Sequence, residues 1–151
     1  MASLPTGKRR AARPDLRVTV YARSPLGAAA VARLAAAVLR AERARLSALS
    51  ITLVGTGRIR TLNRVHLGRD RQTDVIAFAL DGAGDVYICP AVAARQARAF
   101  GVTPKDELRR LVIHGVLHAL GHDHPDGEQR TRSPMWRRQE RYLERYGALA
   151  R

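Results

Sequence analysis

HGVLHALGHDH, the stretch from His114 to His124, constrains the architecture of this chain more than any other part of the sequence. His114 and His118 are four residues apart, so on a helix both side chains lie on one face with their Cβ atoms about 5–6 Å apart. Gly121 follows one turn later and can adopt the left-handed conformation that ends a helix and turns the chain back. A third histidine then lies within reach of the first two.

Three histidine nitrogens favour zinc, and a three-ligand set leaves the fourth position open, as in catalytic rather than structural zinc sites. We take His124 as the third ligand, together with His114 and His118. His122 is the alternative, but it would share their face only if the helix continued through Gly121. With the helix ended at that glycine, His122 lies near the mouth of the site as a proton carrier, or is simply solvated. A crude histidine-rich metal-binding tract is the less specific interpretation.

The sequence around this stretch predicts strands and helices in an irregular order. Thr103, Pro104 and Asp106 carry the N-terminal signals of the helix that holds the histidine pair. This order is typical of an α+β fold with a small mixed β-sheet packed with helices. We expect a disordered basic arm at 1–14 and a single domain at 15–151. The expected strands are 16–22, 49–54, 73–80 and 85–89, with turn residues Asp81, Gly82 and Gly84, and the expected helices are 25–46, 57–66, 90–100, 104–120 and 134–146.

The charge balance points to a polyanionic partner. The chain has 151 residues with 27 Lys and Arg against 13 Asp and Glu, a formal charge of +14. A genome bias accounts for arginine in place of lysine, but it does not account for the excess of basic over acidic residues. No apolar segment is long enough to cross a membrane. The single Cys89 cannot form an internal disulfide, which suggests a reducing compartment and a cytoplasmic location.

The histidine spacing equals that of the metzincin proteases, whose motif is H-E-x-x-H-x-x-G-x-x-H. In that motif the Glu after the first His is the general base. This chain has Gly115 at that position. Glycine cannot accept a proton, whereas a metal in a basic protein would still favour attack on a phosphodiester. The residues therefore favour hydrolysis of RNA over hydrolysis of a peptide.

Three segments together resemble the YbeY endoribonuclease family of bacterial rRNA maturation factors. His114–His124 is similar to its HGxLHLxGYDH signature. Leu62-Asn63 with the segment 68–78, GRDRQTDVIAF, resembles its LN…RxKDxPTDVLSF block, and 84–89, GDVYIC, resembles its LGDIxI strand. The resemblance spans about residues 16–146 in one order of elements.

The resemblance implies a zincin-like hydrolase in which His114, His118 and His124 bind one Zn²⁺. It also implies a single-strand-type endoribonuclease that acts in small-subunit rRNA maturation and ribosome quality control. The expected partners are rRNA and the ribosome or its proteins, with neither membrane nor DNA among them. The family's functional arginine aligns with Leu67, so a neighbouring arginine must supply the charge or the activity is altered. Arg69 is the candidate we name, and Arg64 and Arg71 are its alternatives.

Two residues near the motif have open roles. Asp123 is a candidate catalytic residue that orients a histidine or accepts a proton from water, or it caps backbone N–H groups in the loop. Met135 forms an apolar floor beneath the metal or packs in the core. Besides an endoribonuclease, the sequence leaves a zinc-stabilised ribosome-assembly factor that binds RNA without cutting it, and more remotely a metalloprotease.

Overall fold

The computed structural model describes residues 12–151. Residues 1–11 of the predicted basic arm at 1–14 lie outside this range. Four strands form one sheet in the order β1-β2-β4-β3. Strands β1, β2 and β4 run parallel to one another, while β3, at the edge of the sheet, pairs antiparallel with β4. The predicted mixed sheet is therefore confirmed. The strands are β1 (Asp15–Val20), β2 (Ala48–Leu53), β3 (Val75–Leu80) and β4 (Ala83–Ile88).

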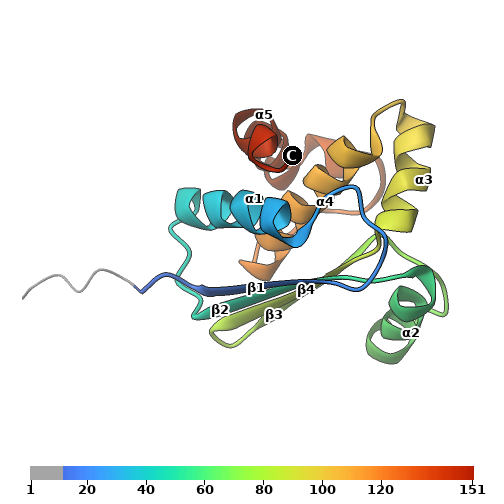
Figure 1. Cartoon of the computed structure of the whole chain (residues 1–151), viewed down its shortest axis with the longest axis horizontal. Coiled ribbons are helices and arrows are strands. Elements are labelled where there is room, and N and C mark those ends of the chain that lie inside the picture. The colour runs from blue at the N-terminus through green and yellow to red at the C-terminus, as the bar shows by residue number, and fades with distance from the viewer. Residues whose placement is uncertain (1–11) are drawn as a thin grey trace, which may run out of the picture.

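Most of the helices cover one face of this sheet. In Figure 1, α1, α4 and α5 lie on that face, and α2 lies at the end of the sheet on the opposite side. The predicted α+β class is confirmed by this arrangement. The helices are α1 (Ala28–Ala41), α2 (Thr56–Leu67), α3 (Pro90–Phe100), α4 (Pro104–Ala119) and α5 (Pro134–Tyr146), with 3₁₀ turns η1 (Gly127–Arg132) and η2 (Gly147–Leu149).

The main core lies between the sheet and these helices. Alternate residues of β2, Leu49, Ile51 and Leu53, are almost fully buried and belong to the same apolar cluster as α1 and α4. Met135 belongs to this cluster too, which supports its interpretation as a core residue. A smaller cluster, which includes the buried Cys89, packs α2 against the other side of the sheet end.

Two predicted boundaries are wrong for identifiable reasons. The helix expected at 25–46 spans only Ala28–Ala41, because Arg43 adopts a left-handed conformation with φ 49° and redirects the chain toward β2. Gly84 belongs to strand β4 rather than to the turn before it. The 3₁₀ turn η1, between the metal motif and α5, was not predicted either.

Helix α4 begins as predicted and lies unusually close to the sheet. The Thr103 hydroxyl accepts a hydrogen bond from the backbone N–H of Asp106 at 3.1 Å, which caps the helix. A Cβ placed on Gly115 would lie 2.6 Å from a methyl group of Val86, and one on Gly84 would lie 2.9 Å from the Cβ of Ala119. Helix α4 and strand β4 therefore pack so closely at Gly115 and Gly84 that neither position has room for a side chain.

Candidate metal centre

The structure brings together the three predicted histidines. His114 and His118 project from the same side of α4, and Gly121, with φ 95°, turns the chain so that His124 returns beside them. Each ring offers one nitrogen, and these three nitrogens all lie within 4.8 Å of one another. The ring centroids are 4.5, 5.1 and 4.9 Å apart.

The remaining ring nitrogens are occupied in a way that suits metal binding. Nδ1 of His114 donates to the side-chain oxygen of Gln139 at 2.6 Å, and Nδ1 of His124 donates to the carbonyl of Pro125 at 3.0 Å. Because these nitrogens carry the proton, Nε2 of each ring keeps its lone pair. The ring of His118 has the backbone of His122 as a hydrogen-bond partner, which acts to raise its pKa against the larger effect of burial. Neutral imidazoles with fixed tautomers are the donor set that zinc and similar borderline cations prefer.

Burial keeps the imidazoles of His114 and His118 unprotonated. Desolvation, with a smaller contribution from the charge of His118, lowers the pKa of His114 to about 4. Desolvation and the charge of His124 also lower the pKa of His118. Near neutral pH both rings are therefore in the form that a cation can bind without first displacing a proton.

A buried side chain of α5 supports His114. Gln139 is 1% exposed, and its amide N–H₂ donates to Glu140 at 3.2 Å while its oxygen faces His114. Arg110 holds Glu140 through a 2.7 Å ion pair and Glu107 through one of 2.9 Å. Gln139 was not predicted from the sequence. A signal was present, since Gln139 lies on the same helical face as the buried Met135 and Tyr142.

His122 points away from the three-histidine cluster. Its Nε2 lies 2.5 Å from a carboxylate oxygen of Glu42, whose side chain is 7% exposed. The same carboxylate accepts hydrogen bonds from Arg138 at 2.7 Å and from Tyr142 at 2.5 Å. His122 is therefore not simply solvated, because this contact anchors the loop to the end of α1 and to α5, and a role as a proton carrier stays a prediction.

Asp123 forms a local cap. Its carboxylate accepts a hydrogen bond from the backbone N–H of His124 at 2.8 Å, and the side chain is exposed. Its charge acts to raise the pKa of His118, against the larger effect of burial. The capping interpretation has direct support in these contacts, and a role in proton transfer stays a prediction.

Arg69 lies in the loop that follows α2. It is exposed, and within residues 12–151 no hydrogen bond or ion pair joins its side chain to the histidines. Asn63 fixes this loop, since its amide donates to the carbonyl of Arg71 at 2.9 Å. Arg60 adds a 2.8 Å ion pair with Asp70. The catalytic role of Arg69 stays a prediction.

Leu67, which the sequence resemblance aligns with the functional arginine of the family, ends α2. It is 50% exposed, so an arginine would fit there without displacing core residues.

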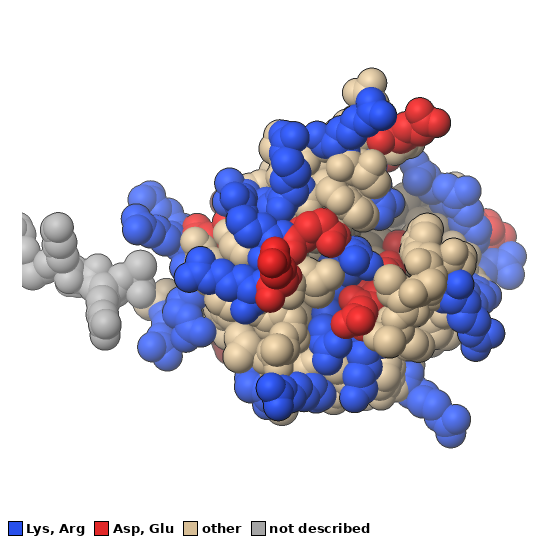
Figure 2. Space-filling view, turned by 90° about the horizontal axis from the view of Figure 1, so that it is seen from above, with Lys and Arg blue, Asp and Glu red and all other residues tan. Residues whose placement is uncertain are grey.

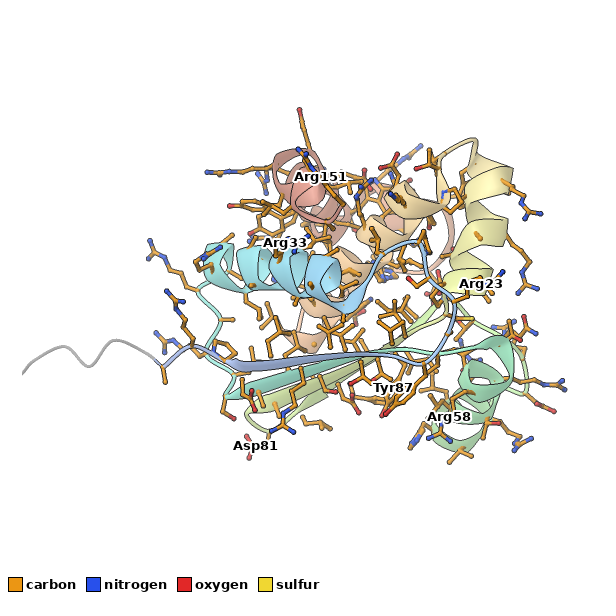
Figure 3. The ribbon with its side chains drawn as sticks, viewed as in Figure 1. Arg23, Arg33, Arg58, Asp81, Tyr87 and Arg151 are labelled. Carbon is orange, nitrogen blue, oxygen red and sulfur yellow. The ribbon has the colours of Figure 1, made fainter. Side chains whose placement is uncertain are left out.

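Basic side chains spread over the surface. Figure 2 shows them around the face seen from above, where they outnumber the acidic side chains, several of which lie near its middle. Figure 3 places Arg33 and Arg151 on the helical side, and Arg58 and Tyr87 on the opposite side of the sheet. Among the described residues, no helix is both long and apolar enough to cross a membrane.

The comparisons with known proteins agree with this geometry. The sequence model described as Endoribonuclease YbeY matches residues 23–147. Endoribonuclease YbeY of Thermotoga maritima is 38% identical over 99 residues, which cover 64% of this chain and 65% of the relative. Its counterpart in Staphylococcus saprophyticus is 36% identical over 112 residues, covering 66% of this chain and 72% of that protein. The match thus spans just under two thirds of the length of the Thermotoga relative.

A solved structure shows the same fold. The solution structure of TM1509 from Thermotoga maritima superimposes with a TM-score of 0.65 and 28% sequence identity, over 88% of this chain and 89% of that one. The family match covers most of the chain, including α4 with the histidine pair and the loop that returns His124. This chain belongs to the Endoribonuclease YbeY family.

Proposed function

We propose that this chain is a metal-dependent endoribonuclease that holds one zinc ion with His114, His118 and His124. The observation that carries the proposal is the cluster of three imidazoles, two of them held by hydrogen bonds with Nε2 left free. The relatives that match over most of the chain are named endoribonucleases. A divalent cation held there would polarise a phosphodiester and the water that attacks it.

The residues around the cluster would position the cation and its substrate. Gln139 and the Pro125 carbonyl fix the orientation of two rings, and burial keeps the imidazoles of His114 and His118 neutral. Arg69 is exposed in the loop after α2, where it would contact an RNA phosphate. Asp123 would help to orient the loop, and its exposed carboxylate is our candidate for accepting a proton.

We further propose rRNA as the substrate, in small-subunit maturation in the cytoplasm, with the ribosome or its proteins as partners. The formal charge of +14 supports a polyanionic substrate, since each arginine that contacts a phosphate releases condensed counterions. A specific site on the rRNA would add base contacts to this electrostatic attraction.

The test combines metal content with cleavage. The purified chain should carry about one zinc ion and cut an rRNA-derived substrate. Chelation or His114→Ala should remove both properties, and added zinc should restore only the chelated wild type. His66→Ala, on α2, is the control for metal retention. Cutting that survives both chelation and His114→Ala would refute the proposed enzyme.

The second candidate is a zinc-stabilised factor that binds RNA without cutting it. The observation that favours it is Leu67, half exposed at the position of the family arginine. Leu67→Arg should raise the cleavage rate if the missing charge limits turnover. An unchanged rate would indicate that Arg69 supplies the phosphate contact instead. Arg69→Gln should then abolish cutting. RNA binding without cutting by the zinc-loaded chain and by Leu67→Arg would favour the second candidate.

Helix α4, which carries the histidine pair, lacks the general base that a protease of the metzincin type needs. Gly115 takes the place of the metzincin glutamate, and its Cβ position is blocked by Val86 and Val75. A general base at this position would therefore have to enter the packed contact with β4. Product from unstructured protein substrates, but not from RNA, would reverse this conclusion.

A further inference from the structure

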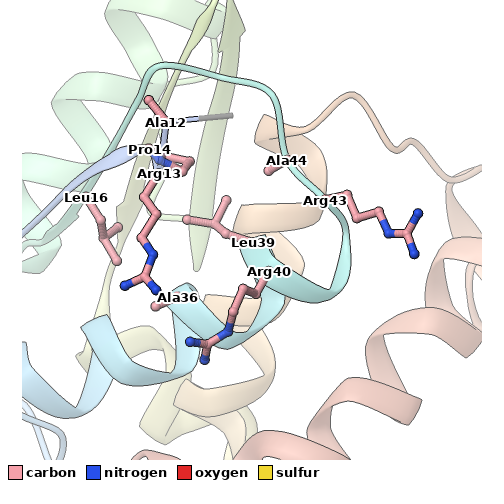
Figure 4. Close-up of a pocket in the computed structure, with 9 residues that line it drawn as sticks. All are labelled: Ala12, Arg13, Pro14, Leu16, Ala36, Leu39, Arg40, Arg43 and Ala44. Carbon is pink, nitrogen blue, oxygen red and sulfur yellow. The ribbon is translucent and has the colours of Figure 1, made fainter. Parts of the chain in front are cut away.

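A cavity of about 300 Å³ opens between the first described residues and the C-terminal end of α1. Its floor is apolar and its rim is basic. Figure 4 shows the Arg13 and Arg40 side chains extending toward the same side, whereas the Arg43 side chain starts at the edge of the opening and extends away from them. We call this surface the arginine pocket and define it by Arg13, Arg40 and Arg43 above Leu16, Leu39 and Ala44.

The three arginines have no acidic partner among the described residues. The ion pairs found within residues 12–151 use other arginines. The segment 1–11 contains Lys8, Arg9 and Arg10 in its sequence, and no Asp or Glu. The guanidinium groups of Arg13 and Arg40 at one opening, without a carboxylate to neutralise them, attract an anion, and Arg43 adds a third positive charge at its edge. The arginines that do form ion pairs are Arg17, Arg60, Arg109, Arg110 and Arg138.

Arg43 occupies a backbone position that favours glycine. It follows the C-cap Glu42 with φ 49°, and the N–H of Ala44 donates back to the carbonyl of Leu39 at 3.0 Å. Helices that end in this way usually have glycine at the left-handed position, because a Cβ is strained there. An arginine at this position gives up stability that glycine would provide, which suggests a functional use of its side chain.

The arginine pocket lies next to the anchor of the metal-binding loop. Arg40 and Arg43 flank the end of α1, and Glu42 between them holds His122 through the 2.5 Å contact. His122 lies between His118 and His124 in sequence. The Glu42–His122 contact therefore joins the rim of the pocket to the loop that completes the three-histidine cluster.

We propose that the arginine pocket binds a nucleotide of the RNA strand at a distance from the bond that is cut. The arginines would contact its phosphate groups, and the sugar or base would lie against Leu16 and Leu39. This inference rests on the proposed function in taking RNA as the ligand. The net charge and the link to the metal-binding loop favour RNA over an acidic peptide.

Binding to a labelled single-stranded RNA tests the pocket without cleavage when the whole chain is kept in EDTA. Arg13→Gln and Arg40→Gln should each weaken binding about fivefold, as expected for the loss of one contact to a phosphate. The slope of log affinity against log salt should fall by about 0.7 for each phosphate that the variant no longer neutralises. With zinc-loaded protein the same variants should raise KM and leave kcat unchanged, since they act away from the reacting bond.

Arg43→Gly separates function from stability. Glycine relieves the strained backbone, so the melting temperature should rise by about 2 °C while RNA affinity falls. A variant that merely disturbed the fold would lose both together. Arg98→Gln is the charge-matched control, because α3 lies across the molecule from the C-terminal end of α1 (Figure 1).

Several outcomes would overturn the pocket. Affinity and salt slope equal to those of the wild type in all three variants would do so, as would an equal loss in Arg98→Gln. If a polyglutamate peptide displaces the RNA from the wild type but not from the arginine variants, the pocket binds an acidic protein partner instead. If the variants bind RNA more weakly but the wild type never cuts it, the pocket is supported and the enzyme is refuted. If the wild type cuts RNA and the variants cut it with an unchanged KM, the enzyme is supported and the pocket is refuted.

Discussion

His122 and Glu42 are 80 residues apart in sequence, and Nε2 of His122 lies 2.5 Å from the Glu42 carboxylate. The contact joins the metal-binding loop to the end of α1. Burial alone would raise the pKa of Glu42, but hydrogen bonds from Tyr142, Arg138 and His122 outweigh it and lower the pKa. Glu42 is therefore ionised near neutral pH and binds three donors from two other parts of the chain.

Removing the charge of Glu42 should loosen this loop. We expect Glu42→Gln to lower the free energy of unfolding by about 1–3 kcal/mol, because three donors lose a charged acceptor in a largely buried place. Zinc binding should weaken as well, since His124 is two residues from His122. Urea unfolding and zinc titration measure the two effects. Glu144→Gln, exposed on α5, is the matched control, and equal behaviour of the two variants would contradict the anchoring role.

Gln139 should control zinc affinity through His114. Gln139→Met keeps the approximate volume but removes the acceptor of the Nδ1 proton. Losses of a partner of this kind weaken metal binding about 10- to 100-fold. Met135→Leu, one turn earlier in the same core, is the control for a general packing change. If both variants lower the melting temperature alike and neither changes the zinc dissociation constant, Gln139 has only a packing role.

Gly115 should tolerate no side chain. Its Cβ would lie 2.6 Å from Val86 and 3.3 Å from Val75, both on strands that α4 covers. Overpacking of this kind typically costs about 1–3 kcal/mol, so Gly115→Ala should lower the free energy of unfolding despite the better helix propensity of alanine. Gly57→Ala in α2 is the control, because nothing lies within 4 Å of its Cβ position. That substitution should stabilise the chain by about 0.5–1 kcal/mol. A stabilising Gly115→Ala would show that α4 can shift from the sheet.

The part of the site that is formed by residues close in sequence could be predicted from the sequence. His114, His118, Gly121 and His124 lie within eleven residues, and helix periodicity with one glycine reversal suffices to bring the three rings together. The start of α4 was predictable for the same reason, since Thr103 and its partner are three residues apart.

The residues that support the site were not predictable in this way. The Gln139 contact with His114 spans 25 residues and the Glu42 contact with His122 spans 80, so no local pattern pairs them. The end of α1 was misplaced because arginine at position 43 gives no signal for a left-handed residue. Gly115 was interpreted only as a missing base, whereas its close approach to Val86 depends on how α4 lies on the sheet.

The metal-free protein should lose stability as the pH falls. The pKa of His114 is lowered to about 4, below its ordinary value of 6.5, so the unfolded chain binds a proton that the folded chain excludes. The contribution of His114 is therefore fully present above about pH 6.5 and is lost as the pH falls toward 4, by up to about 3 kcal/mol. Urea unfolding in EDTA across this range measures the loss. In His114→Gln, which has no group to titrate at this position, the pH dependence should be shallower, and parallel profiles for the two proteins would contradict the assignment.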